Sequence, residues 1–125
     1  MKTILIVEDT ELNIDLLTQL LEDEYTLFVA NDGAAGVKTA LETKPDLILM
    51  DISLPIMDGY EATREIRKSL AVTPIIGLSA HAMDSQIIKA QNAGCSDYLT
   101  KPVDEGKLFD MLKKYLGYRG ASHHT

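Results

Sequence analysis

The sequence predicts an α/β fold in which a five-stranded parallel sheet is covered by helices on both faces. Short apolar runs alternate with amphipathic stretches of helical length, five times in succession. Most of the runs are apolar at every position, which is typical of parallel strands buried between two layers of helices. Several runs end in charged residues, and ligands bind in such folds outside the carboxyl ends of the strands.

The first two strand–helix units are marked by their boundaries. Residues 3–7 form the first strand, and Thr10 or Glu11 begins a helix whose apolar face we expect to consist of Leu12, Leu16, Leu17, Leu20 and Leu21. Residues 25–30 form the second strand. The turn at 31–33 starts the second helix, whose apolar face is Val37, Ala40 and Leu41. This helix ends before Pro45, because a residue that precedes proline avoids helical geometry.

The remaining three units follow the same alternation. Residues 47–50 form the third strand and 59–69 the third helix. Pro74 introduces a fourth strand at 75–78, and a helix near 84–93 ends at Gly94, a residue type common at helix C-termini. A short fifth strand lies at 97–100. The last helix turns an apolar face inward, made of Leu108, Met111, Leu112 and Tyr115.

Length and composition restrict the classes of protein. A chain of 125 residues indicates one domain, which we place at residues 1–118, with a disordered tail at 119–125. The net charge of -7 argues against binding to nucleic acid or anionic lipid. No apolar stretch approaches the ~18 residues of a membrane span. A single cysteine and no signal peptide predict a cytoplasmic protein, and Met1 so close to the first strand predicts a stand-alone domain.

Charged residues at three strand ends predict one site. Glu8 and Asp9 follow the first strand, Asp51 ends the third, and Lys101 follows the fifth. Three crowded carboxylates repel one another, and Mg²⁺ relieves this repulsion because it prefers carboxylate, water and phosphate oxygens. Lys101 supplies a positive charge for a phosphate, and Ser79 supplies a hydroxyl at the end of the fourth strand. This set suits phosphoryl transfer onto the carboxylate of Asp51.

The chain resembles the receiver domains of response regulators in two-component signalling, over residues 3 to about 116. The resemblance is carried by Glu8-Asp9, by Asp51-Ile52-Ser53-Leu54-Pro55-Ile56-Met57-Asp58-Gly59, and by Ala93-Gly94-Cys95-Ser96-Asp97-Tyr98-Leu99-Thr100-Lys101-Pro102. It implies a flavodoxin-like, doubly wound (βα)5 fold with strand order 2-1-3-4-5. We expect Asn13 to be an ordinary helix residue, although it also resembles single-domain receivers and the receivers of hybrid histidine kinases.

The resemblance also implies roles for individual residues. Asp51 would be the phosphoacceptor, taking a phosphoryl group from a histidine kinase or histidine phosphotransfer protein. Asp9, with Glu8 through water, would hold Mg²⁺, or Mn²⁺ in its place, together with Asp51 and the backbone carbonyl of Ser53.

Further implied roles concern the response to phosphorylation. Lys101 would bind the acyl phosphate and form a cis peptide with Pro102. Ser79 would move to the phosphate, and Tyr98 would be the switch aromatic. Ser53 and His81 would border the path of the attacking water and set the lifetime of the aspartyl phosphate.

Other interpretations remain open at this point. A small-molecule phosphohydrolase of the haloacid dehalogenase type would carry a second aspartate where Ser53 stands. A flavin-binding protein would need a glycine- and hydroxyl-rich loop after the first strand, where this chain is acidic. A third possibility is a fragment of a hybrid kinase, which the methionine directly before the first strand disfavours, and a fourth is an interaction module that is never phosphorylated. Asp9 is also well placed to cap the first helix, Asp84 or Ser85 to cap the fourth, and Tyr98 suits simple packing. With no basic second domain in the chain, we expect output through an unknown downstream protein rather than through DNA.

Overall fold

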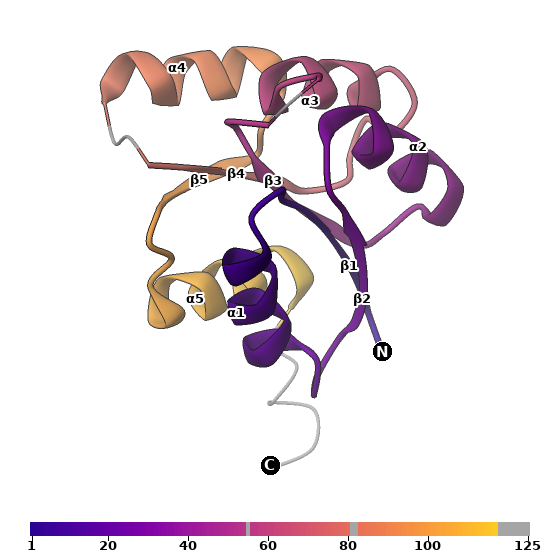
Figure 1. The fold of residues 1–125 in the computed structure, drawn as a ribbon, viewed down its shortest axis with the longest axis vertical. Helices are drawn as coiled ribbons and strands as arrows, with labels where there is room; N and C mark the ends of the chain where they lie inside the picture. Colours follow the sequence, from indigo (N-terminus) through magenta and orange to yellow (C-terminus); the bar gives the residue numbers. More distant parts are fainter. Residues whose placement is uncertain (55, 81–82, 118–125) are drawn as a thin grey trace.

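The described part of the chain folds into a five-stranded parallel sheet with five helices (Figure 1). The computed structural model describes residues 1–54, 56–80 and 83–117. The elements in chain order are β1 (Thr3–Val7), α1 (Glu11–Leu21), β2 (Thr26–Ala30), α2 (Gly33–Thr43), β3 (Leu47–Asp51), α3 (Gly59–Arg67), β4 (Ile75–Ser79), α4 (Asp84–Ala93), β5 (Asp97–Thr100) and α5 (Glu105–Leu116). The sheet order is β2-β1-β3-β4-β5, which confirms the predicted α/β class and strand order. The tail expected at 119–125 lies outside the described residues.

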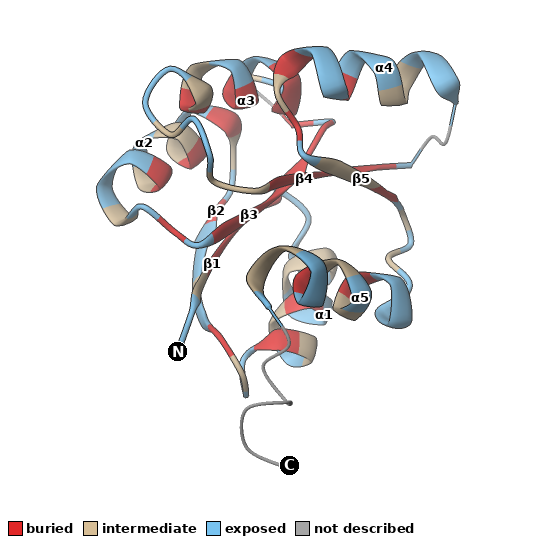
Figure 2. Cartoon of the chain, turned by 180° about the vertical axis from the view of Figure 1, so that it is seen from behind, coloured by how far each residue is buried: buried red, intermediate tan, exposed pale blue. Residues whose placement is uncertain are grey.

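Helices cover both faces of the sheet. In Figures 1 and 2, α1 and α5 lie on one face, and α2, α3 and α4 lie on the other. Alternate residues of a strand point to opposite faces, so β1 sends Ile4 and Ile6 into the core under α1 and α5. Leu5 and Val7 enter the core under the other three helices. Both cores therefore depend on the same central strands.

Side-chain caps fix three of the five helix starts. Asp32, Asp58 and Asp104 each accept a hydrogen bond from a backbone N–H three residues later, at the starts of α2, α3 and α5. The N-caps of α1 and α4 are Thr10 and Met83, and neither makes such a bond. The sequence suggests Asp9 as the cap of α1 and Asp84 or Ser85 as the cap of α4, and none of these residues is the N-cap in the structure. The two helices without caps follow β1 and β4, at the edge where the site lies.

Several apolar side chains expected in the core are exposed. Leu12 and Leu16 of α1 are 67% and 51% exposed, and Leu41 of α2 is 38% exposed. Leu17 and Leu21 lie on the face of α1 that packs against the sheet. Leu12 and Leu16 lie on the adjacent face of this helix, which is exposed to solvent. β2 is an edge strand that begins at Thr26, and its Phe28 and Val29 are each 40% exposed. The sequence shows apolar residues but not which strand lies at an edge.

No helix within the described ranges has both the length and the apolar character needed to cross a membrane.

Arg67 connects loops at the amino-terminal edge of the sheet, which is opposite the edge where Asp51 lies. Its Nε donates to the carbonyl of Gly94 at 2.9 Å, and its Nη1 donates to the carbonyls of Leu70 and Thr73 at 2.8 and 2.6 Å. Its Nη2 donates to Ser96 Oγ at 3.2 Å. One guanidinium thus donates hydrogen bonds to three carbonyls in the loops at this edge.

We expect Arg67→Met to lower the free energy of unfolding by about 2–3 kcal/mol, because the carbonyls lose a charged donor. Urea unfolding monitored by circular dichroism measures this change. Arg64→Met, at an exposed position of the same helix, is the matched control and should cost much less. Equal losses in the two variants would contradict the role given to Arg67.

Candidate functional site

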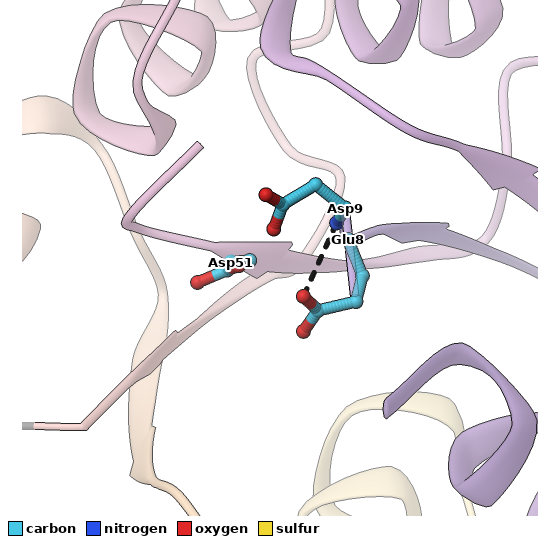
Figure 3. Close-up of side chains that lie close together, drawn as sticks. All are labelled: Glu8, Asp9 and Asp51. Carbon is cyan, nitrogen blue, oxygen red and sulfur yellow. Dashed lines mark hydrogen bonds between the residues drawn. The ribbon is translucent and has the colours of Figure 1, made fainter. Parts of the chain in front are cut away.

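Three carboxylates from two adjacent strands meet at the carboxyl edge of the sheet. Glu8 and Asp9 follow β1, and Asp51 is the last residue of β3, which pairs with β1. Figure 3 shows Asp9 above and Glu8 below the level of Asp51. One oxygen from each of the three lies within 4.8 Å of the others. The cluster that the sequence predicts is therefore present.

The three acids differ in burial and in hydrogen bonding. Glu8 is fully buried and Asp51 is 2% exposed, whereas Asp9 is exposed. Glu8 Oε2 accepts hydrogen bonds at 3.1 Å from the backbone N–H groups of Asp9 and Thr10. Asp51 Oδ1 accepts one at 3.1 Å from the N–H of Ser53. The loops that follow the strands thus fix the two buried acids, and Asp9 faces solvent.

Lys101 joins the two buried acids. Its Nζ lies 2.9 Å from Glu8 Oε1 and 3.1 Å from Asp51 Oδ1. Within the described residues Glu8 Oε1 has no hydrogen bond, because this ion pair lacks hydrogen-bond geometry. The Lys101–Pro102 peptide is cis, as the resemblance implies. One ammonium therefore offsets part of the charge of two carboxylates.

Burial and the neighbouring acid raise the pKa of Asp51 to about 6, and Lys101 opposes this rise. Burial also acts to raise the pKa of Glu8, but the nearby Lys101 ammonium, the Asp51 carboxyl group and the backbone N–H of Thr10 outweigh burial and lower this pKa. Burial acts to lower the pKa of Lys101, and the two carboxylates outweigh it and raise that pKa. Burial, and after it the neighbouring carboxylate, thus make Asp51 the acid of the pair with the raised pKa.

The donor atoms of this cluster fit Mg²⁺. They are carboxylate oxygens, two of them are held in place, and Mg²⁺ prefers a few carboxylates together with waters. Glu8 Oε1 is buried and lies 2.9 Å from the Lys101 ammonium but makes no hydrogen bond within the described residues, so it could accept one from a water that accompanies the metal. Asp9, Asp51 and the Ser53 backbone carbonyl would hold the ion.

Comparison with known proteins identifies the family. Residues 4–113 match the response regulator receiver domain. The chain is 36% identical over 119 residues to the polar-differentiation response regulator DivK of Brucella anthropi, covering 93% of this chain and 97% of that protein. The chain belongs to the response regulator receiver domain family.

Solved receiver structures share the fold. The receiver domain of sensor histidine kinase PA1611 from Pseudomonas aeruginosa, with magnesium in its active-site cleft, gives a TM-score of 0.86 at 37% identity, covering 94% of this chain and 98% of that one. A second match is the co-crystal structure of the Saccharomyces cerevisiae histidine phosphotransfer protein Ypd1 with the receiver domain of Ssk1. It gives a TM-score of 0.86 at 31% sequence identity, and the match covers 91% of this chain and 88% of that one.

The other residues expected in this receiver's site lie on β4, β5 and the loop after β3. Ser79 ends β4, is 2% exposed, and its carbonyl accepts the Lys101 N–H at 2.7 Å. Tyr98 pairs with Gly77 of β4 and packs against the core under α4. Ser53 is exposed beside Asp51. His81, proposed with Ser53 to set phosphate lifetime, lies outside the described residues.

Two glycines that the sequence marked only as helix starts hold the loop that follows Asp51. A Cβ on Gly59 would lie 2.3 Å from the Asp51 carbonyl oxygen, and one on Gly33 would lie 1.9 Å from the Met57 carbonyl oxygen. Both approaches exclude any side chain. The spacing of Asp32-Gly33 and Asp58-Gly59 in the sequence gives the helix starts but not these contacts.

We expect the free energy of unfolding to depend on pH because ionisation of Asp51 is unfavourable in the folded state. A raised pKa in the folded state means that the fold binds the proton more tightly than the unfolded chain does. Stability is therefore lost as pH rises from about 4 to above 6. Asp51→Asn removes this loss and should raise the unfolding free energy by about 1–3 kcal/mol at pH 7.5 and by less at pH 5.

Urea unfolding of both proteins in EDTA at the two pH values measures the effect. Asp15→Asn, at an exposed position on α1, removes the same charge away from the cluster and should show no such pH dependence. A gain from Asp51→Asn that is equal at both pH values would contradict the raised pKa.

Proposed function

We propose that this receiver domain is a phosphorylation switch in which Asp51 accepts a phosphoryl group from a phosphohistidine partner. The observation that carries the proposal is the buried Asp51 carboxylate at the strand ends, which lies beside both Lys101 and the acid pair Glu8 and Asp9. The chain would modify itself and lose the phosphoryl group again, without turnover of a small-molecule substrate.

The residues divide the chemistry of transfer among them. A carboxylate oxygen of Asp51 forms a bond to phosphorus as the phosphorus–nitrogen bond to the histidine breaks, and that electron pair returns to the imidazole. Lys101, 3.1 Å from Asp51 Oδ1, neutralises a phosphoryl oxygen. Mg²⁺ held by Asp9, Asp51 and the Ser53 carbonyl, with Glu8 through water, would neutralise the others. At neutral pH and above, Asp51 is mostly ionised and able to attack.

The response to phosphorylation would pass through Ser79 and Tyr98. Ser79 lies at the strand end next to Asp51, because Asp51 pairs with Leu78. Its hydroxyl would bond the phosphoryl group, which adds charge and strong acceptor oxygens. Tyr98, one strand further and under α4, would repack when Ser79 moves. The pre-existing balance of conformations would shift toward one with a changed surface at α4, β5 and α5.

The partners follow from the family. A histidine kinase or histidine phosphotransfer protein would supply the phosphoryl group, which the complex of Ypd1 with the Ssk1 receiver supports. The output would be contact with a downstream protein. The acidic net charge disfavours nucleic acid, and one buried cysteine suits a cytoplasmic location.

Incubation with Mg²⁺ and acetyl phosphate should add one phosphoryl group to the chain, seen by intact-mass spectrometry. The adduct should be absent in Asp51→Asn and when EDTA replaces the metal. Asp15→Asn should be labelled like the wild type, since its carboxylate lies on the exposed face of α1. A wild-type chain that binds Mg²⁺ but gains no mass would instead indicate an unphosphorylated interaction module.

A larger side chain at Ser53 should lengthen the life of the phosphorylated state. Ser53 is exposed and its N–H contacts Asp51, so bulk there would obstruct the water that attacks the phosphorus. We expect Ser53→Leu to slow dephosphorylation by about threefold or more, equivalent to ~0.7 kcal/mol in the barrier. The loss of the adduct over time measures this, with Ser69→Leu, exposed after α3, as the control. If the phosphorylated state has the same half-life in Ser53→Leu and Ser69→Leu, Ser53 does not control dephosphorylation.

A further inference from the structure

Ile56 combines two properties that the fold itself does not require. Its φ is +70°, in the left-handed region, and its side chain is 85% exposed. A β-branched residue in this region is an outlier, whereas glycine adopts it without a steric penalty. Because the side chain lies in solvent, its apolar surface gains nothing from the core of this chain. Both the strain and the exposure call for a reason outside the fold.

The loop holds Ile56 in this conformation from both sides. Leu54 before it is buried, and Met57 after it packs against the core. The Met57 carbonyl lies against Gly33, and the Asp51 carbonyl lies against Gly59. The backbone is therefore fixed by packing, and the isoleucine side chain is presented outward at a fixed place in the loop that follows Asp51.

Ile56 belongs to a set of exposed apolar residues that follow the strands at the carboxyl edge of the sheet, and we term this set the apolar rim. Its members are Leu12, Ile56 and Met83. Leu12 lies in the first turn of α1 and Met83 is the N-cap of α4, so the three follow β1, β3 and β4. All three elements leave the sheet at the edge where Asp51 lies. Leu12 and Met83 are 67% and 61% exposed.

We propose that Ile56 is the apolar anchor on which a histidine phosphotransfer domain docks when it delivers its phosphoryl group. The inference rests on the proposed function of Asp51. Because the Asp51 side chain is almost fully buried, a histidine on a protein reaches it only if the surface around that histidine covers the rim. Removal of exposed apolar surface from water stabilises such a contact. A small phosphodonor reaches Asp51 without this contact.

The test compares two donors on matched variants. Ile56→Asn removes the apolar group and keeps a residue that tolerates positive φ, and Ile56→Gly also removes the strain. Val72→Asn is the control, since Val72 is 91% exposed in the loop before β4, at the opposite edge of the sheet. The donors are acetyl phosphate and yeast Ypd1 phosphorylated on its histidine. Phosphorylation is followed by intact mass, and stability by urea unfolding.

We expect Ile56→Asn and Ile56→Gly to accept phosphate from Ypd1 about five- to tenfold more slowly than the wild type, as for loss of an interface anchor. Labelling by acetyl phosphate should be unchanged, and Ile56→Gly should unfold at a higher urea concentration. Val72→Asn should match the wild type with both donors. A variant that is phosphorylated more slowly by Ypd1 alone, and that is at least as stable as the wild type, has lost a docking contact rather than a structural one.

Three results would overturn the inference. Transfer from Ypd1 that is equally fast in Ile56→Asn and Val72→Asn excludes the anchor. A wild-type chain labelled by acetyl phosphate but not by Ypd1 excludes a docking site for this class of donor and leaves the proposed function standing. A wild-type chain labelled by neither donor overturns the proposed function, and the inference with it.

Discussion

The structure of the site depends on one ammonium group shared by two buried carboxylates. Lys101 lies within 3.1 Å of both Glu8 and Asp51, so two negative charges share one positive charge away from water. Such a cluster is costly unless further charge or hydrogen bonds complete it. The raised pKa of Asp51 expresses this cost, and a cation at Asp9 would reduce it. The excess of negative charge that disfavours the isolated fold is what makes the site receptive to Mg²⁺.

The parallel sheet makes this arrangement possible. β1 and β3 are adjacent and in register, so the residues that follow Val7 and Met50 meet at one edge. β4 continues the series and brings Ser79 beside Asp51, while the turn after β5 returns Lys101 to the centre. Since both faces of the sheet are filled by core residues, the strand ends are the place where charged groups can gather at low cost.

The sequence predicts the features that follow from the alternation of strands and helices. It does not predict features that depend on tertiary contacts, such as the burial of a particular side chain. Apolar runs located the central strands, and charges after them located Glu8, Asp9, Asp51 and Lys101. The same reasoning placed Leu12 and Leu16 in the core, because helical spacing identifies a face without saying how much of it the sheet covers. The positive φ of Ile56 left no sequence signal, since glycine, asparagine or aspartate would be expected there. The contact of Gly33 with Met57 joins segments distant in sequence, and neither it nor the contact of Gly59 with Asp51 could be predicted from the sequence.

The loop that follows Asp51 is also connected to α4 by side-chain contacts. Gly59 donates its N–H to the Ile52 carbonyl at 2.9 Å, which closes the loop onto the strand that ends in Asp51. The next residue, Tyr60, hydrogen-bonds through its hydroxyl to Gln86 of α4, and the ammonium of Lys89 lies 4.6 Å from the centroid of its ring. Because α4 lacks a side-chain cap, these contacts and the packing near Tyr98 fix its position. Helix α4 is therefore held from two directions, by Tyr60, which follows the loop after Asp51, and by the packing around Tyr98 of β5.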